Sequence, residues 1–203
     1  MNLYTIVFDR RHYVSMIWDS AQIIKLSNNE LDHRIDMNGA PIRHASIFKE
    51  PLRVTFTSNS KEDKGLLRPE ITVQQGRFYF SQRAYNVLKP LIENDGEFLP
   101  LIDEHGDMAY VFTPLRVAED VAGLNTKLSR KNQWGDLESL AFHENKVKGW
   151  TVFRADFNAH MTPQCNQAVK DAIEEADLKG VFFTTDLGNG YSNQFDEGVQ
   201  IKN

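Results

Sequence analysis

The segment Asp103-Glu104-His105-Gly106-Asp107 is the densest cluster of side chains that could do chemistry. Three carboxylates and an imidazole can together bind a divalent cation or act as general acid and base. The same residue types suit the tip of a β-hairpin, because Asp and Gly favour turn geometry and the charges stay solvated. We favour the hairpin tip. The alternative is a metal-dependent hydrolase or nuclease in which this loop acts with a distant histidine.

The histidines and glycines do not form the usual ligand-binding motifs. The 6 histidines are scattered, and no two are two or four residues apart. Zinc ligands must converge within about 2.0–2.3 Å of one ion, and local pairs are their usual signature. No phosphate-binding GxxxxGK[ST] motif is present, and Gly188-Asn189-Gly190 lacks the third glycine of a dinucleotide-binding loop. We therefore expect no bound metal or cofactor.

The single cysteine, Cys165, is a possible nucleophile. Thr162-Pro163 predicts the start of a helix, with a capping hydroxyl followed by proline at the first helical position. Cys165 would then lie in the first turn, where a helix N-terminus lowers the pKa of a thiol. No glycine-flanked nucleophile motif surrounds it, so we interpret Cys165 as a packed residue and predict that the protein is not an enzyme.

The three tryptophans indicate a binding function. Trp18, Trp134 and Trp150 each lie beside polar or glycine-containing sequence and outside the strongest apolar runs. Exposed tryptophan is a typical anchor of protein–protein interfaces. We predict that Trp134 and Trp150 contact a partner.

Length and composition limit the possible classes of protein. The chain has 203 residues, of which 41% are hydrophobic and 25% charged, and its net charge is −5. This composition excludes wholesale disorder, and an acidic balance gives no support to nucleic-acid binding. No apolar run approaches the ~20 residues that a membrane-spanning helix needs. With one cysteine and no recognisable secretion signal, we expect a cytoplasmic location.

Negative charge increases toward the end of the chain. Residues 151–203 carry four positive and eight negative side chains. Three of these carboxylates, Asp171, Glu174 and Glu175, fall on one predicted helix. This helix is a candidate docking site for a basic partner, but we favour the alternative that it is a solvated helix face.

Apolar periodicity predicts several strands. Leu3–Phe8 is β-branched and aromatic, and residues 13–18 could be its antiparallel partner. Residues 71–73 and 77–80 flank Gly76 and predict a hairpin. Residues 98–102 and 108–112 flank the acidic loop and predict a second hairpin.

Two helices and a final strand complete the expected elements. Ser81 can cap a helix whose apolar residues recur at helical spacing, with a kink or an early end at Pro90. The second helix is the one expected after Thr162-Pro163. It would end at Gly180, and residues 181–185 would return to the sheet as a strand.

Residues 68–186 resemble a family of predicted immunity proteins from bacterial polymorphic-toxin systems (contact-dependent or type VI-like), formerly a domain of unknown function. Three landmarks carry the resemblance: Ser81 before a helix containing Leu88-Lys89-Pro90-Leu91, the strand Val152-Phe153-Arg154, and a closing helix followed by Gly180 and an aromatic strand. The resemblance implies a protein that binds a cognate toxin and holds it inactive. It supplies no catalytic residues.

We therefore predict a single α+β domain, with a mostly antiparallel sheet and helices packed on one face. Residues 1–65 would form a strand-rich region packed on the rest, residues 66–190 the immunity-like domain, and residues 191–203 a tail. The predicted function is stoichiometric occlusion of a toxin, without nucleic acid or membrane as a partner. A toxin-delivery adaptor or chaperone is a further alternative. The predicted partner-binding residues are Asp103, Glu104, His105, Asp107, Trp134, Trp150, Asp171, Glu174 and Glu175.

Overall fold

The computed structural model describes residues 2–56 and 65–188 of the chain. In those residues the chain forms four α-helices and twelve β-strands. The helices are α1 (Ser20–Leu26), α2 (Gln82–Ile92), α3 (Glu144–Val147) and α4 (Gln167–Glu175). The strands are β1 (Leu3–Phe8), β2 (Ile17–Trp18), β3 (Leu52–Thr55), β4 (Ile71–Gln74), β5 (Arg77–Ser81), β6 (Gly96–Ile102), β7 (Met108–Pro114), β8 (Arg130–Lys131), β9 (Leu137–Ser139), β10 (Val152–Phe153), β11 (Gln164–Asn166) and β12 (Val181–Thr184).

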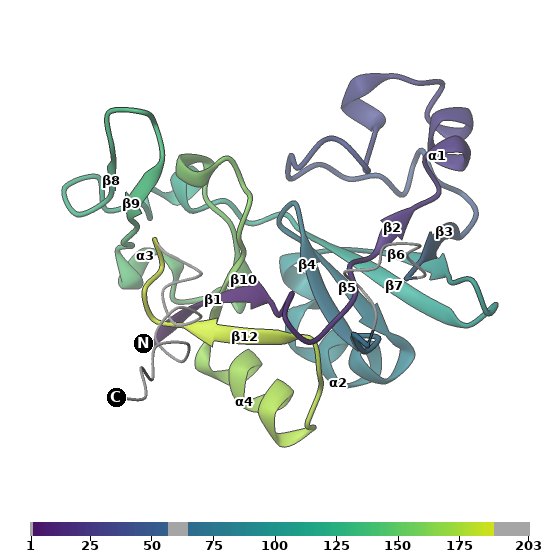
Figure 1. Cartoon of the computed structure of the whole chain (residues 1–203). Helices are drawn as coiled ribbons and strands as arrows, with labels where there is room; N and C mark the ends of the chain where they lie inside the picture. The colour runs from purple at the N-terminus through teal and green to yellow at the C-terminus, as the bar shows by residue number, and fades with distance from the viewer. Residues whose placement is uncertain (1, 57–64, 189–203) are drawn as a thin grey trace, which may run out of the picture.

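The strands form three sheets (Figure 1). The largest has the order β2-β3-β6-β7-β5-β4, the second has the order β10-β11-β1-β12, and β8 pairs with β9 alone. All pairings are antiparallel except that of β3 with β6. The predicted α+β class with mainly antiparallel sheet is confirmed, and both predicted hairpins are present as β4–β5 and β6–β7.

The six-stranded sheet is covered on both faces. Successive residues of a strand point to opposite faces, and β5 shows this alternation: Phe78 and Phe80 pack with α2 and α4, whereas Tyr79 packs with Ile23 of α1. The face away from α2 and α4 is covered by α1 and the loop that follows it, residues 19–50, here called the N-terminal cover. The two predicted helices thus share one face, and α1 adds a layer that the sequence analysis did not predict.

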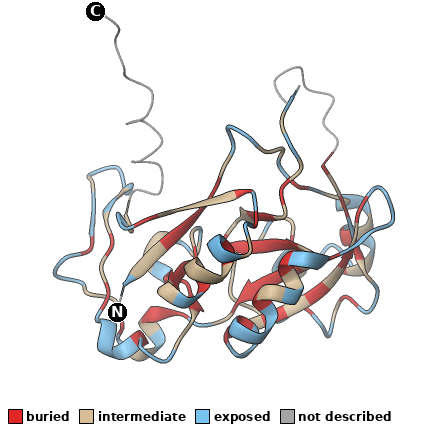
Figure 2. Cartoon of the chain, turned by 90° about the horizontal axis from the view of Figure 1, so that it is seen from below, coloured by how far each residue is buried: buried red, intermediate tan, exposed pale blue. Residues whose placement is uncertain are grey.

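Helix α2 begins where the sequence predicts. The Ser81 hydroxyl accepts a hydrogen bond from the Ala84 amide at 3.2 Å, which satisfies one of the unpaired donors at the helix start. The buried face of α2 is a single line of residues at i, i+4 and i+8: Ala84, Leu88 and Ile92. The outer faces of the helices are exposed (Figure 2). Pro90 lies in the last turn, so the helix continues only two residues beyond it.

The predicted partner of β1 is wrong. Ile17 and Trp18 pair with β3, whereas β1 lies between β11 and β12 in the second sheet. The segment between β1 and β2 has no tight turn sequence that would fold them into a hairpin. Both partners of β1 come from the last quarter of the chain, which a local pattern cannot reveal.

The helix predicted after Thr162-Pro163 starts too early. Residues 164–166 form β11, and α4 begins at Gln167 with the Asn166 side chain accepting from the Val169 amide at 3.3 Å. Cys165 therefore lies in the middle of a sheet rather than at a helix N-terminus. It is fully buried, and burial raises the pKa of its thiol, which agrees with the packed residue that we favoured.

Two buried arginines join the N-terminal cover to the sheets. Arg77 donates to the carbonyl oxygens of Ile35 at 3.4 Å and Ala40 at 3.2 Å. Arg154 donates to the carbonyl oxygens of Gly39 at 2.7 Å and Pro114 at 2.6 Å. Burial lowers the pKa of Arg77 to about 10; burial and the charge of Arg77 lower that of Arg154 to about 9. Both arginines are charged at neutral pH, and backbone carbonyls stabilise these charges.

Arg154 should be among the most important residues for stability. Replacing it in Arg154→Ala leaves a cavity and removes the donors to Gly39 and Pro114, so we expect the free energy of unfolding to fall by about 3 kcal/mol or more. Urea denaturation followed by circular dichroism measures this change. Arg53→Ala, at an exposed position on β3, is the control and should change it by less than about 0.5 kcal/mol. Equal stability of the two variants would contradict the assigned role.

Stability should also depend on His44 of the N-terminal cover. The His44 ring is fully buried and stacks on Phe48 with ring centroids 5.9 Å apart. Burial, followed by the charge of Arg77, lowers its pKa from 6.5 to about 4. Between these values the unfolded chain binds a proton that the folded chain does not. The free energy of unfolding should therefore fall with falling pH, by up to about 1.4 kcal/mol per pH unit from this group.

Denaturation of His44→Leu at a series of pH values measures this contribution. The variant should lose the part of the pH dependence that lies between pH 6.5 and 4, because it has no imidazole to protonate. An unchanged pH profile would show that His44 is not the group responsible.

Candidate functional site

The acidic loop between β6 and β7 is a hairpin tip whose first residue is structural. Asp103 is buried, and its Oδ1 accepts the amides of His105 and Asp107, both at 2.8 Å. Its Oδ2 pairs with Arg68. Burial by itself would raise the pKa of Asp103, but the two amides and Arg68 lower it overall. Asp103 therefore holds the turn together and is not available to a partner.

The other residues of this loop do not assemble a metal centre. Glu104 accepts the Phe56 amide at 3.2 Å and lies 3.8 Å from Arg68, while His105 and Asp107 are exposed. Over residues 2–56 and 65–188, no group of three or more His, Cys, Asp or Glu side chains could hold a metal ion. In the same part of the chain, no helix is long and apolar enough to cross a membrane.

Trp134 and Trp150 differ sharply in exposure. Trp134 is 78% exposed at the tip of the β8–β9 hairpin. Trp150 is half-buried in a small core with Phe153, with ring centroids 5.9 Å apart, and the Arg116 guanidinium lies 5.8 Å from its ring. Of the two predicted contact residues, Trp134 has the geometry of an interface anchor, whereas Trp150 fills a core.

The tip that carries Trp134 is internally ordered. Asn132 Oδ1 accepts the amides of Trp134 and Asp136, both at 2.9 Å, and Asn132 Nδ2 donates to the Asp136 carboxylate at 3.0 Å. Gly135 takes a positive φ of +90°, which lets the chain turn back. The indole is thus presented on a fixed turn, so that little backbone entropy would be lost when a partner covers it.

One of the three carboxylates on the predicted acidic face of α4 is paired with a cation of the same helix. Glu174 pairs with Lys170 at 2.5 Å, and Asp171 accepts from Gln167 at 2.7 Å. Glu175 is exposed. These contacts fit a solvated helix face better than a docking site for a basic partner.

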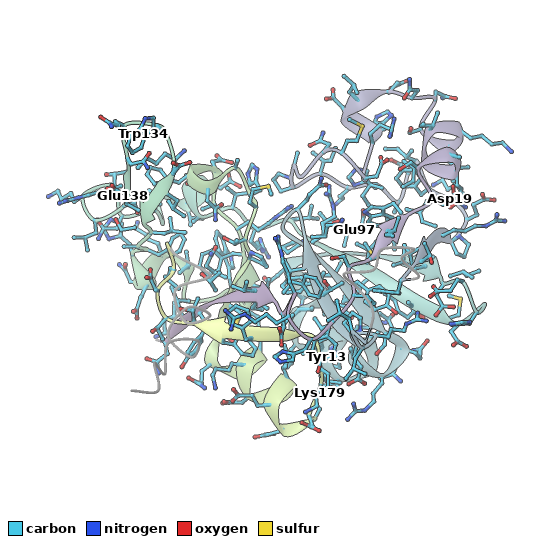
Figure 3. The ribbon with its side chains drawn as sticks, in the orientation of Figure 1. Tyr13, Asp19, Glu97, Trp134, Glu138 and Lys179 are labelled. Carbon is cyan, nitrogen blue, oxygen red and sulfur yellow. The ribbon has the colours of Figure 1, made fainter. Side chains whose placement is uncertain are left out.

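The structure does not bring the predicted partner-binding residues together. The β8–β9 hairpin lies at one end of the molecule, the turn between β6 and β7 at the other, and α4 below them (Figure 1). Trp134 and Glu138 project from the β8–β9 end, far from the labelled Asp19 of the N-terminal cover (Figure 3). Of the three predicted surfaces, the one at Trp134 has the strongest features of a binding site.

Two neighbouring hollows lie beside the Trp134 hairpin. One hollow, of about 330 Å³, has apolar walls that include Leu137, Phe157 and Leu187. A second hollow, of about 490 Å³, is more polar and lies against Gln74 and Gln75 of the β4–β5 turn. The two adjacent hollows, here together called the central groove, share three lining residues: Val7, Met161 and Thr162.

The loop that forms the floor of the central groove, residues 156–162, is held from several directions. Both Glu119 carboxylate oxygens accept amides of this loop, those of Asp156 and Phe157, each at 3.0 Å. Asn158 donates to the Thr162 hydroxyl at 2.6 Å. Ala159 takes a φ of 53°, a left-handed conformation that costs energy for a residue with a Cβ atom. Such strain is concentrated at functional sites in proteins.

The β4–β5 turn is pressed against this loop. A Cβ atom at Gly76 would lie 1.8 Å from the His160 carbonyl oxygen, so only glycine fits between the two segments. On the opposite side, the Lys131 ammonium lies 5.0 Å from the centre of the Phe157 ring. The walls of the central groove are therefore fixed to its floor at both ends.

The sequence analysis missed the central groove. Its floor falls in the stretch before Thr162-Pro163, and for residues 156–161 we predicted no element. Met161 and Phe157 are apolar residues in a polar loop, and this was the one available signal. The pairing of that loop with the β8–β9 hairpin and β1 is set by tertiary contacts, which the local sequence does not encode.

A scan against models of known protein families and a search of curated proteins found no match to this chain.

The two tryptophans should respond differently to truncation. Trp150→Ala removes core contacts with Phe153, so the free energy of unfolding should fall by about 2 kcal/mol or more. Trp134→Ala removes an exposed side chain and should change it by less than about 0.5 kcal/mol. Chemical denaturation of both variants checks this difference. A large destabilisation by Trp134→Ala would mean that Trp134 serves the fold rather than binding.

Proposed function

We propose that this protein is an immunity-type inhibitor that binds a cognate bacterial toxin in the cytoplasm and neutralises it by stoichiometric occlusion, without catalysis. The observation that carries the proposal is Trp134, which is 78% exposed on an ordered hairpin tip. Tryptophan is enriched among the residues that dominate the binding energy of protein–protein interfaces.

The surroundings of Trp134 support an interface of useful size. Leu128, at the base of the same hairpin, is 59% exposed, and Met161 in the neighbouring groove is 51% exposed. Together with the groove they provide apolar area beside a fixed anchor. Stable protein–protein interfaces bury about 800 Å² on each partner, with a few anchors supplying most of the affinity.

Co-expression with the toxin encoded by the adjacent gene tests the proposal. The wild-type chain should restore growth, and purified chain should abolish toxin activity at a molar ratio of one to one. An enzyme that inactivates the toxin would act at far lower ratios. An adaptor would form the complex without restoring growth. Either result would contradict occlusion.

Trp134→Ala should weaken toxin binding on the order of 10–100-fold, because hot-spot aromatic residues contribute about 2 kcal/mol or more. Leu31→Ala is the matched control, since Leu31 is 69% exposed but lies on the N-terminal cover. Isothermal titration calorimetry with the purified toxin measures both affinities. Equal affinities for the two variants would remove the role assigned to Trp134.

A further inference from the structure

We infer that the central groove binds an extended segment of the toxin that carries an apolar side chain and at least one carboxylate. This inference rests on the proposed function for the identity of the partner. It adds the site and the chemistry of the segment that is bound.

The charge at the apolar hollow favours an acidic segment. Lys131 lines this hollow, and no carboxylate is among the described residues that line either hollow. Residues 124–150, which include the adjoining hairpin, contain five Lys or Arg and three Asp or Glu, in a chain whose net charge is −5. The Lys131 ammonium attracts carboxylates and discriminates against basic segments.

The cations that line the two hollows, Lys131 and Arg10, are too few for a nucleic acid. Phosphate backbones are bound by clusters of lysine and arginine spaced along the strand. The apolar walls of the hollow beside Phe157 and Leu137 do not suit a phosphate group. They suit an aliphatic or aromatic side chain. The composition of the groove is therefore that of a polypeptide-binding site.

The geometry of the groove suits an extended segment rather than a compact ligand. Its two hollows are neighbours at Val7, Met161 and Thr162, so an extended occupant that fills both would run from the β8–β9 hairpin to the β4–β5 turn. An apolar side chain would enter the hollow at Phe157, and the chain would continue past Met161 toward Gln74. Carboxylates would face Lys131.

A display library of random linear 12-residue peptides tests the inference directly, with the full-length chain immobilised. The enriched peptides should combine an aromatic or large aliphatic residue with Asp or Glu. Absence of enrichment, or enrichment of basic peptides, would overturn the inference.

Substitution of Met161 localises the binding site. Met161→Asp places a carboxylate at the junction of the two hollows and should weaken the enriched peptides at least ~10-fold, measured by calorimetry. Met37→Asp is the matched control, because Met37 is 60% exposed on the N-terminal cover. Both variants should keep the wild-type melting temperature to within a few degrees. Equal peptide binding by the two variants would overturn the assignment to the groove.

The same variants distinguish failure of this inference from failure of the proposed function. If the wild-type chain and Met161→Asp both restore growth equally against the toxin, the protein neutralises the toxin without the groove, and the inference fails alone. If the groove binds acidic peptides but the wild-type chain does not inhibit the toxin, the proposed function fails, and the groove serves a different polypeptide.

Discussion

Two buried guanidinium groups, those of Arg77 and Arg154, hold the architecture together. Each is charged and donates to backbone carbonyls, including those of Ile35, Gly39 and Ala40 in the N-terminal cover. Burying a charge costs free energy unless hydrogen bonds compensate for the lost hydration. Because these donors and acceptors depend on each other, the cover and the sheets should lose their order together.

Two buried carboxylates also bind the backbone, but they accept hydrogen bonds from amides, whereas the arginines donate to carbonyls. Glu97 at the start of β6 accepts the amides of His44 and Ala45, at 2.5 and 3.2 Å, and Asp95 accepts those of Thr151 and Val152, at 2.7 and 3.1 Å. Most buried ionisable groups described here thus bind backbone, which fixes irregular loops that have no periodic hydrogen bonding.

The sequence predicted those elements whose partners are close in the chain. Both central hairpins and the helix capped by Ser81 follow from alternation, turn residues and capping. The partners of β1 and the strand at Cys165 were not predictable, because pairing across more than 150 residues leaves no local trace. Thr162-Pro163 is a helix-start signal, but it was outweighed because the residues after it pair with β1 and β10 as strand β11. Trp134 was predicted as a contact residue; the groove beside it depends on tertiary packing.

The position of β1 between β11 and β12 also has a consequence during synthesis of the protein. Leu3–Phe8 leaves the ribosome well before both of its neighbours in the sheet, β11 and β12, are translated. At about 5–20 residues per second, this apolar segment waits roughly 10 to 35 s for them. During translation it is an unpaired strand that other nascent chains can capture, so we expect its protection to depend on chaperones.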